Sequence, residues 1–362
     1  MKMIFFQPEY VKNFKCDGVK CGAQCCKGWT IDIDLETLES YLEIESSAKE
    51  LTSKIVFNEK RNGCVTKLDE NSHCAFLDKD NLCTIQKNYG EKFLSMICQT
   101  FPRRIIKIAD LYERSLNLTC PLVAEMALLP KSPMNFELVE ENVPDDSKVG
   151  AQIPMHIDEK ILPFISEIQM TAIFILQKRT LTIDQRLAIL GIYFDSLEKI
   201  ISSGDLEKLS DLTEIFTSKN LPALSTKLIF NPKDFTQFFM NNVLENLYDE
   251  ETVNKFLLTN RANFIKKFSS ILENYLVHEF FLNTYPFRVE GTIIHNYAIF
   301  IALYKIVEVA LFHSAQNVND LIKKIVKLSP VINHTPEYLQ KISAELKTFD
   351  SVEKIITTFL QI

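Results

Sequence analysis

Two features that would assign a protein class at once are scarce in this sequence. Glycine supplies only nine of 362 residues, and no G-x-G pattern occurs among them. Nucleotide-binding units of the Rossmann type use glycines in that spacing to bring the backbone close to phosphates, so no such unit is expected. Apolar side chains recur with a 3.6-residue period over long stretches, which predicts a mainly α-helical protein.

Long apolar runs are also lacking. The longest, from Gly291 to His313, is interrupted by four polar residues, His295, Asn296, Lys305 and Glu308. It therefore falls short of the roughly 18 clean apolar residues of a membrane span. Met1 to Phe6 is too short for the core of a signal peptide. With 46% apolar and 24% charged residues, the chain is expected to be a packed, soluble and cytoplasmic protein.

Positive charge is in deficit. Lysine and arginine number 40 against 47 aspartates and glutamates, which gives a net charge of -7. A chain with this balance has no broad electrostatic attraction for phosphate groups. We therefore expect neither nucleic acid nor a membrane as a partner.

Cysteine is absent after position 120, although nine cysteines lie within the first 120 residues. Random scatter would place all nine there with a probability on the order of 5 × 10⁻⁵, so the cluster needs a chemical explanation. In a reducing compartment, clustered thiols usually bind metal or carry out redox chemistry. Eight of these cysteines either lie close together in sequence or stand beside residues that favour an ordered backbone. These eight are our candidate metal ligands: Cys16, Cys21, Cys25, Cys26, Cys74, Cys83, Cys98 and Cys120.

We expect these eight thiols to converge in one region, with Cys64 outside it. Thiolates favour tetrahedral zinc sites or iron in clusters held by four cysteines. Eight thiols could supply one cluster with spares or two zinc ions. The spacing does not decide between these metals.

The chain is expected to fall into three parts. Residues 1–130 form a cysteine-rich metal-binding module with small β elements, 131–156 a connecting segment, and 157–362 a helical domain packed against the module. The connecting segment is indicated by four prolines among acidic residues. The 3.6-residue pattern predicts helices at 158–178, 183–202, 205–217, 234–258, 260–283, 291–314 and 335–361.

Local signals predict several elements in more detail. Short strands are expected at 64–68 and 73–77, and a hairpin at 105–118 that turns at Ala109-Asp110. Asp34 is placed to cap a helix over 35–45, and Pro121 to begin another that runs through Leu129. Thr182 and Gln185 match a capping box.

Several motifs follow one another in a specific order. The first is Tyr10-Val11-x2-Phe14-x-Cys16-x4-Cys21-x3-Cys25-Cys26-x-Gly28-Trp29, and later ones are Cys74-Ala75-Phe76-Leu77, Leu94-Ser95-x2-Cys98-x2-Phe101-Pro102-Arg103, Gln177-Lys178-Arg179, Gln185-Arg186-Leu187 and Glu273-Asn274-Tyr275-Leu276 leading to Tyr285-Pro286-Phe287. In this order they resemble the flagellin lysine-N-methylase family. That family is related to the CxxCxxCC proteins thought to chelate zinc or iron, although four residues separate Cys16 from Cys21 here.

The resemblance implies methyl transfer from S-adenosylmethionine to surface lysines of flagellin. It also implies a cysteine-bound metal centre, an iron-sulfur cluster of the 4Fe-4S type or zinc. The residues themselves indicate the metal site but not methylation, since the Rossmann and radical S-adenosylmethionine spacings are both absent. Asn333-His334-Thr335 is similar to a motif of SET-domain methylases, but the accompanying glycine-rich segment is missing, so we treat it as coincidence. A non-enzymatic, metal-stapled interaction or scaffold protein is the alternative.

Lysine methylation by direct displacement needs a neutral amine, whereas a lysine with a pKa of about 10.4 is mostly protonated at neutral pH. Tyr275, Glu279 and Tyr285 lie on or just beyond one predicted helix and are our catalytic candidates. Four further residues could hold the cofactor through ring stacking or its carboxylate: Trp29, Arg103, Arg179 and Arg186. For each candidate a structural role is the alternative, namely packing, capping or a salt bridge.

Overall fold

The computed structural model describes residues 2–16, 18, 21–143, 154–218, 221, 228–242 and 248–362. The chain divides into two compact units. One contains Met1–Ala124 with Phe136–Ile153, and the other contains Glu125–Asn135 with Pro154–Ile362. We call them the cysteine-rich unit and the helical unit.

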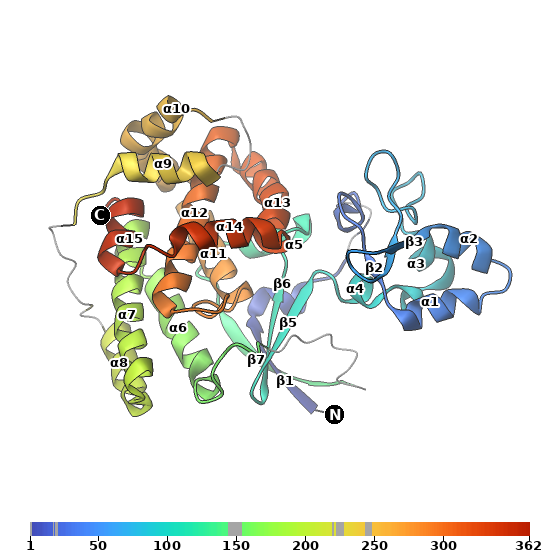
Figure 1. The fold of residues 1–362 in the computed structure, drawn as a ribbon, viewed down its shortest axis with the longest axis horizontal. Coiled ribbons are helices and arrows are strands. Elements are labelled where there is room, and N and C mark those ends of the chain that lie inside the picture. The colour runs from blue at the N-terminus through green and yellow to red at the C-terminus, as the bar shows by residue number, and fades with distance from the viewer. Residues whose placement is uncertain are drawn as a thin grey trace. The chain divides into compact units, whose positions relative to one another are not determined.

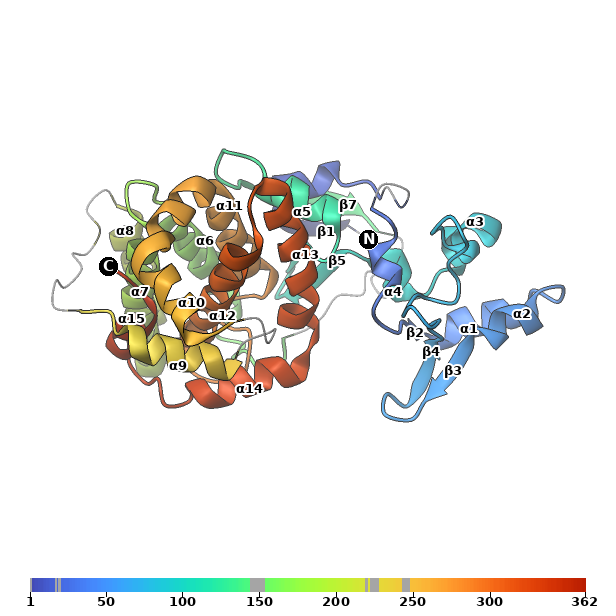
Figure 2. The same cartoon turned by 90° about the horizontal axis from the view of Figure 1, so that it is seen from above.

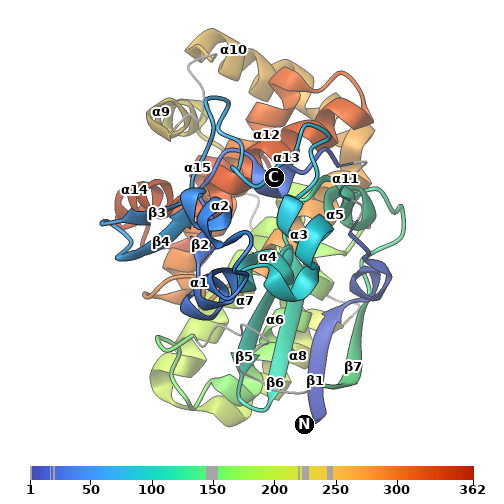
Figure 3. The same cartoon turned by 90° about the vertical axis from the view of Figure 1, so that its right-hand side faces the viewer.

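The cysteine-rich unit contains two small sheets. The four-stranded sheet has the order β5-β6-β1-β7 and the three-stranded sheet the order β2-β4-β3 (Figure 3). The strands are β1 (Lys2–Pro8), β2 (Asp32–Ile33), β3 (Ile55–Asn58), β4 (Gly63–Thr66), β5 (Arg103–Ile108), β6 (Leu111–Leu116) and β7 (Phe136–Asn142). The hairpin of β5 and β6 confirms the predicted one, with Ala109 at a positive φ of 51° in its turn.

Strand β7 lies inside the residues expected to connect the two domains. It pairs antiparallel with β1 from Lys2–Asn142 to Pro8–Phe136, so this stretch belongs to a sheet. Residues 125–135 group with the helical unit, where Asn274 donates its side-chain amide to the carbonyls of Leu128 (3.2 Å) and Pro130 (2.8 Å). The division of the structure thus differs from the expected boundaries.

Four short helices belong to the part of the cysteine-rich unit that holds the three-stranded sheet (Figure 2): α1 (Leu35–Leu42), α2 (Ala48–Ser53), α3 (Thr84–Tyr89) and α4 (Met96–Thr100). Helix α5 (Pro121–Leu128) crosses the boundary between the two units after Ala124. Asp34 caps α1 as predicted, because its carboxylate accepts the backbone N–H of Thr37 at 2.9 Å. The same carboxylate accepts the N–H of Met96 at 3.0 Å and so joins α1 to α4.

Helices build the rest of the chain (Figure 1). They are α6 (Ile165–Leu176), α7 (Ile183–Ser203), α8 (Leu209–Thr217), α9 (Pro232–Asn242), α10 (Glu250–Lys255), α11 (Arg261–Leu282), α12 (Ile293–Ser314), α13 (Val318–His334), α14 (Pro336–Leu346) and α15 (Val352–Phe359). The predicted mainly helical fold is confirmed, and so is the capping box of Thr182 and Gln185 at the start of α7.

The helices of the structure differ from the predicted ones in three places. The stretch 234–258 holds two helices, α9 and α10, with 243–247 outside the described residues. The stretch 335–361 is divided between α14 and α15, because Ser351 caps a new helix. Helix α13 was not predicted, and it carries Pro330 in its interior, a residue that normally ends a helix.

Helix α12 forms the centre of the helical unit and packs against α7, α11, α13, α14 and α15. Among the described helices it alone reaches the length and composition of a membrane span, and 83% of its most apolar window is buried inside the protein. From the sequence, the apolar run from Gly291 to His313 was expected to fall short of a membrane span. Burial of this kind is that of a core helix, whose interrupting Lys305 and Glu308 are used in internal ion pairs.

These ion pairs form a buried charge network of Asp184, Arg261, Lys305 and Glu308. Arg261 donates to both oxygens of Asp184, at 2.6 and 2.7 Å, and to Glu308. The Nζ of Lys305 lies 3.2 Å from Asp184. Two cations therefore balance two carboxylates inside the helical unit, each with 5% exposure or less.

Candidate functional site

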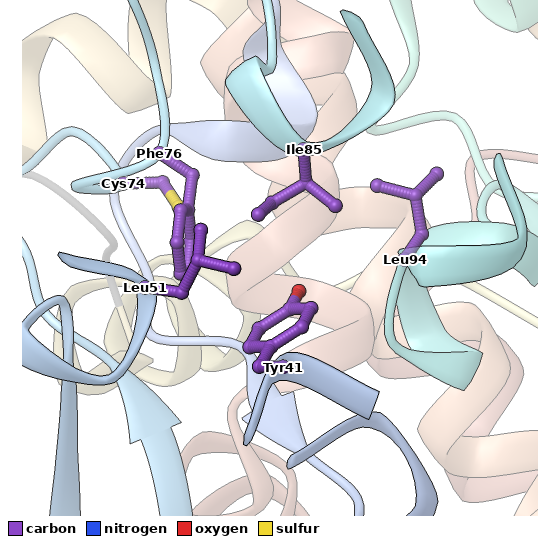
Figure 4. Packing of buried hydrophobic residues seen from close by; sticks show 6 residues of the cluster. All are labelled: Tyr41, Leu51, Cys74, Phe76, Ile85 and Leu94. Carbon is purple, nitrogen blue, oxygen red and sulfur yellow. The ribbon is translucent and has the colours of Figure 1, made fainter. Parts of the chain in front are cut away.

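Five cysteines gather around one small core in the cysteine-rich unit. Cys74 is buried there with Tyr41, Leu51, Phe76, Ile85 and Leu94 (Figure 4), and Cys26, Cys83 and Cys98 pack against this core. The Sγ of Cys25 lies 3.7 Å from the Sγ of Cys26. We call Cys25, Cys26, Cys74, Cys83 and Cys98 the five-cysteine group.

Four separate segments bring these thiols together. Cys25 and Cys26 lie in a 3-10 turn that the chain enters through Ala23 at a positive φ of 53°. The N–H of Cys74 donates to the carbonyl of Cys26 at 2.8 Å. Cys83 directly precedes α3, and Cys98 lies in α4, where its N–H donates to the side chain of Ser95. Backbone hydrogen bonds and helix caps therefore position the group.

The thiols influence one another electrostatically. A hydrogen bond from Cys26 lowers the pKa of Cys25 to about 7, because it stabilises the Cys25 thiolate. Burial raises the pKa of Cys98 to about 12, and negative charge on Cys83 and Cys74 adds to the increase. Burial likewise raises the pKa values of Cys74 and Cys83. Neighbouring thiols cannot all ionise in such a site unless a cation compensates the negative charges of the resulting thiolates.

The other three candidate cysteines form a second set. Burial raises the pKa of Cys120 to about 11, and negative charge on Cys21 and Cys16 contributes, so both of these thiols lie within electrostatic range of Cys120. We call Cys16, Cys21 and Cys120 the three-cysteine group. Cys64 lies in β4 opposite Ile33 and Phe57. These interactions join five and three of the eight candidates, and the convergence of all eight in one region stays a prediction.

The five-cysteine group fits a metal centre by its donor chemistry. Soft thiols come from several segments around a core of only six buried residues, a core that a metal crosslink would strengthen. As the side chains stand, no three histidine, cysteine, aspartate or glutamate side chains of the described ranges are close enough to bind an ion. Metal binding would therefore require the thiols to turn toward a common centre.

Trp29 contacts the five-cysteine group, and Arg103 lies two residues after Phe101, a neighbour of the Trp29 ring. The indole N–H of Trp29 donates to the carbonyl of Cys25 at 3.0 Å, and its ring centroid lies 6.4 Å from that of Phe101. Arg103 begins β5 two residues later, with its guanidinium 5.6 Å from the ring centroid of Phe14. The structure thus places the Trp29 ring beside the backbone of Cys25, whereas the Arg103 guanidinium packs on Phe14.

Arg179 and Arg186 are instead engaged within the helical unit. Both donate to the buried carboxylate of Glu273, Arg179 at 2.7 Å and Arg186 also at 2.7 Å. Arg186 donates further to the carbonyls of Leu176 and Leu181. Both arginines therefore form a salt bridge within the unit. Such a structural role was the alternative to cofactor binding.

The three catalytic candidates line one cavity of the helical unit. Tyr275 and Glu279 come from α11, Tyr285 follows that helix, and the remaining lining residues are Leu276, Arg288, Phe300, Leu303, Tyr304 and Ile332. The space open to the centre of a water-sized sphere is about 10 Å³. It therefore holds about one water molecule, and a lysine side chain would require it to open.

The polar groups of this cavity have distinct chemistry. Burial raises the pKa values of Tyr275 and Tyr285, so both phenols stay protonated at neutral pH. Arg288 donates to the Tyr285 hydroxyl at 3.0 Å and to the carbonyl of Ile332 at 2.7 Å. Glu279 supplies the only carboxylate among the lining residues. A carboxylate, the phenols of Tyr275, Tyr285 and Tyr304, and several aromatic faces suit the recognition of an ammonium group.

Sequence reasoning did not select Arg288 and Tyr304, which also line the cavity. Arg288 follows Tyr285 by three residues, a spacing that could have indicated it. Tyr304 comes from α12 and could be placed only by the packing of α11 against α12.

Two family models match this chain. Residues 169–358, more than half of it, match the FliB lysine N-methylase C-terminal domain, and residues 15–121 match the CxxCxxCC model, described as a proposed zinc- or iron-chelating domain. The chain belongs to the FliB lysine N-methylase family. The resemblance found in the sequence motifs is thereby confirmed.

Individual members of this family are similar over part of their length. A lysine-N-methylase of Salmonella choleraesuis (strain SC-B67) is 35% identical over 127 residues, which cover 34% of this chain and 32% of the relative. The lysine-N-methylase of Salmonella typhimurium (strain LT2) is 34% identical over the same length and the same shares. The flagellar biosynthetic protein FliU of Salmonella muenchen is 34% identical over 127 residues, 75% of its length. The match thus spans about a third of the two lysine-N-methylases. No solved structure matches this chain.

Proposed function

We propose that this protein transfers methyl groups from S-adenosylmethionine to surface lysines of flagellin. Membership of the FliB lysine N-methylase family is the observation that carries the proposal. The names of the relatives, lysine-N-methylase and flagellar biosynthetic protein, support the reaction and the substrate. A cytoplasmic location stays a prediction from composition.

The five-cysteine group is our proposal for the metal centre. Cys26, Cys74, Cys83 and Cys98 share one core and would supply four ligands, with Cys25 beside Cys26 as an exchangeable fifth thiol. When bound, a 4Fe-4S cluster would supply redox or Lewis-acid chemistry, whereas zinc would supply a structural crosslink. The three-cysteine group remains a candidate for a second ion.

For the cofactor we propose Trp29 and Arg103, since a ring and a cation suit the adenine and the carboxylate of S-adenosylmethionine. Arg179 and Arg186 would contribute only by releasing Glu273, to which both donate.

For the lysine we propose the cavity of Tyr275, Glu279 and Tyr285. Glu279 would attract the ammonium group, and the protonated phenols would orient the nitrogen. The ammonium first loses a proton, to Glu279 or to water. The nitrogen lone pair then forms the new N–CH3 bond while the S–CH3 bond breaks and its electron pair stays on sulfur.

Anaerobic purification followed by iron, zinc and sulfide analysis, and then a transfer assay with labelled S-adenosylmethionine and flagellin, tests the proposal. We expect iron with sulfide, and label on flagellin lysines. Zinc without sulfide would replace the iron-sulfur assignment by a structural zinc site. Absence of transfer by metal-loaded protein would instead support the scaffold alternative.

A further inference from the structure

The carboxylate of Glu279 is held by two asparagine side chains. The Nδ2 of Asn333 lies 3.3 Å from Oε1 and 3.1 Å from Oε2 of Glu279. The Nδ2 of Asn283 lies 3.0 Å from Oε2. The two asparagines are joined to each other, since Asn283 donates to the Oδ1 of Asn333 at 3.1 Å. We call Asn283 and Asn333 the amide clamp.

The clamp links two segments that are distant in sequence. Asn283 follows Glu279 by one helical turn at the end of α11, and its amide also donates to the Glu279 carbonyl at 3.1 Å. Asn333 lies in the last turn of α13. The same end of α13 supplies the Ile332 carbonyl that accepts from Arg288, the donor to Tyr285. One helix end therefore supports both Glu279 and Tyr285.

Amides stabilise a carboxylate without neutralising its charge. In the described part of the chain, Glu279 makes no ion pair with lysine or arginine, although Arg288 lines the same cavity, and the Nδ1 of His278 lies 3.7 Å from its Oε1. Glu273 contrasts with it, because two arginines compensate that equally buried carboxylate. The Glu279 carboxylate is thus held by amide donors and has no lysine or arginine partner in an ion pair, which leaves a charged partner to be supplied by a cation that enters the cavity.

We propose that Asn333, together with Asn283, is a positioning residue that fixes the Glu279 carboxylate toward the cavity for a substrate ammonium. The inference rests on the proposed lysine site. It also gives Asn333 of the Asn333-His334-Thr335 tripeptide a role in this fold that has no connection with a SET-domain motif.

A double-mutant cycle on the metal-loaded protein tests this role. The variants are Asn333→Ala, Glu279→Gln and the double variant, with Asn333→Leu as a replacement of similar volume that also lacks donors. Asn254→Ala is the matched control, since it removes one side-chain hydrogen bond, from Thr236 at 3.0 Å, in the same unit. The measured quantities are kcat and KM for the flagellin substrate, with helical circular dichroism as the folding check.

We expect Asn333→Ala and Asn333→Leu to lower kcat by about 10- to 100-fold, because a small misplacement of a reacting group has that order of effect. In the Glu279→Gln background, Asn333→Ala should add no further loss, since it acts through Glu279. The control should keep its rate.

Three results would overturn the proposal, and each contradicts a different part of it. An unchanged kcat in Glu279→Gln would contradict the proposed lysine site itself. A lowered kcat in Glu279→Gln together with an unchanged kcat in both Asn333 variants would be consistent with the lysine site but would contradict the positioning role of the amide clamp. Multiplicative losses in the double variant would show that Asn333 acts independently of Glu279.

Discussion

The two units bury polar groups in opposite ways. In the helical unit, cations of the protein itself compensate the buried carboxylates of the charge network, and both charges of each pair come from neighbouring helices. In the cysteine-rich unit, five thiols gather at a core of six buried residues that includes Cys74, and none of the ion pairs in the described residues joins a cation to them. The first arrangement is complete within the chain. The second becomes favourable only with a bound cation, which makes the cysteine-rich unit the one whose folding should depend on a ligand.

Metal removal should produce the largest difference between the units. We expect chelation, or Cys74→Ser, to unfold the cysteine-rich unit, because metal binding free energies on the order of 10 kcal/mol contribute directly to folding of such modules. Hydrogen exchange resolved by unit, with metal content measured in parallel, checks this. Cys64→Ser is the control and should change neither. Loss of helical-unit protection upon chelation would contradict the comparison.

Breaking the charge network should produce the next largest effect, confined to the helical unit. Arg261→Met removes the cation that donates to both Asp184 and Glu308, and leaves two buried carboxylates with Lys305 alone. We expect a loss of about 3–5 kcal/mol in the free energy of unfolding, measured by denaturant titration. Lys199→Ala removes the exposed pair with Asp195 and serves as control, with an expected loss below about 1 kcal/mol.

The same network predicts how the helical unit responds to acid. Burial opposes ionisation of Asp184, but Arg261 and Lys305 outweigh it and hold the pKa of this carboxyl at about 2. Because this pKa is depressed, the stabilisation is present above about pH 4, the ordinary range of aspartate, and is lost as the pH falls toward 2. Denaturant titrations between pH 5 and 2 should show this slope. Arg261→Met should flatten it, and an unchanged slope in that variant would contradict the assignment.

Local signals explain which parts of the fold were predictable. Asp34, Pro121 and Thr182 act on backbone within one turn, and the Ala109 turn joins adjacent strands, so the sequence sufficed for these elements. The pairing of β1 with β7 could not be predicted, since its partners lie more than 125 positions apart and each strand is irregular in polarity. Pro330 concealed α13 because proline usually interrupts a helix.

The residues of the candidate site also differ in whether local sequence spacing or only tertiary packing brings them together. Helical spacing was enough to group Tyr275 with Glu279, and both line the cavity as neighbours of Tyr285. Asn333 required tertiary packing, because its partner Glu279 lies 54 residues away. The gathering of five thiols likewise depends on how the 3-10 turn of Cys25 and Cys26, the segment of Cys74, α3 and α4 fold around one core, which spacing alone does not encode.

Packing density gives a smaller contrast between the units. A Cβ on Gly191, inside α7, would lie 2.6 Å from the Tyr297 hydroxyl and 2.8 Å from a methyl group of Val352. Tyr297 has little freedom to move, since its hydroxyl donates to the Leu187 carbonyl at 2.8 Å. Gly191→Ala should therefore destabilise by about 1–3 kcal/mol despite the better helix propensity of alanine. Gly63→Ala in β4 meets nothing closer than 3.7 Å and should be tolerated. Equal thermal melting of the two variants would contradict the difference in packing.

The smallest effect concerns the helix caps, one in each unit. Thr182→Ala removes a capping box that serves α7 alone, for an expected loss of about 1 kcal/mol. Asp34→Ala should cost more, about 2 kcal/mol, since its carboxylate caps α1 through Thr37 and also accepts from Met96 at the start of α4, the helix that carries Cys98. Asp34→Asn keeps one acceptor oxygen and should recover part of the loss. Denaturant titration of the metal-loaded protein measures each change, and exchange at α4 should increase only in the Asp34 variants. If Thr182→Ala proves the more damaging change, the link between α1 and α4 contributes little to the stability of the cysteine-rich unit, and metal binding alone would have to account for its order.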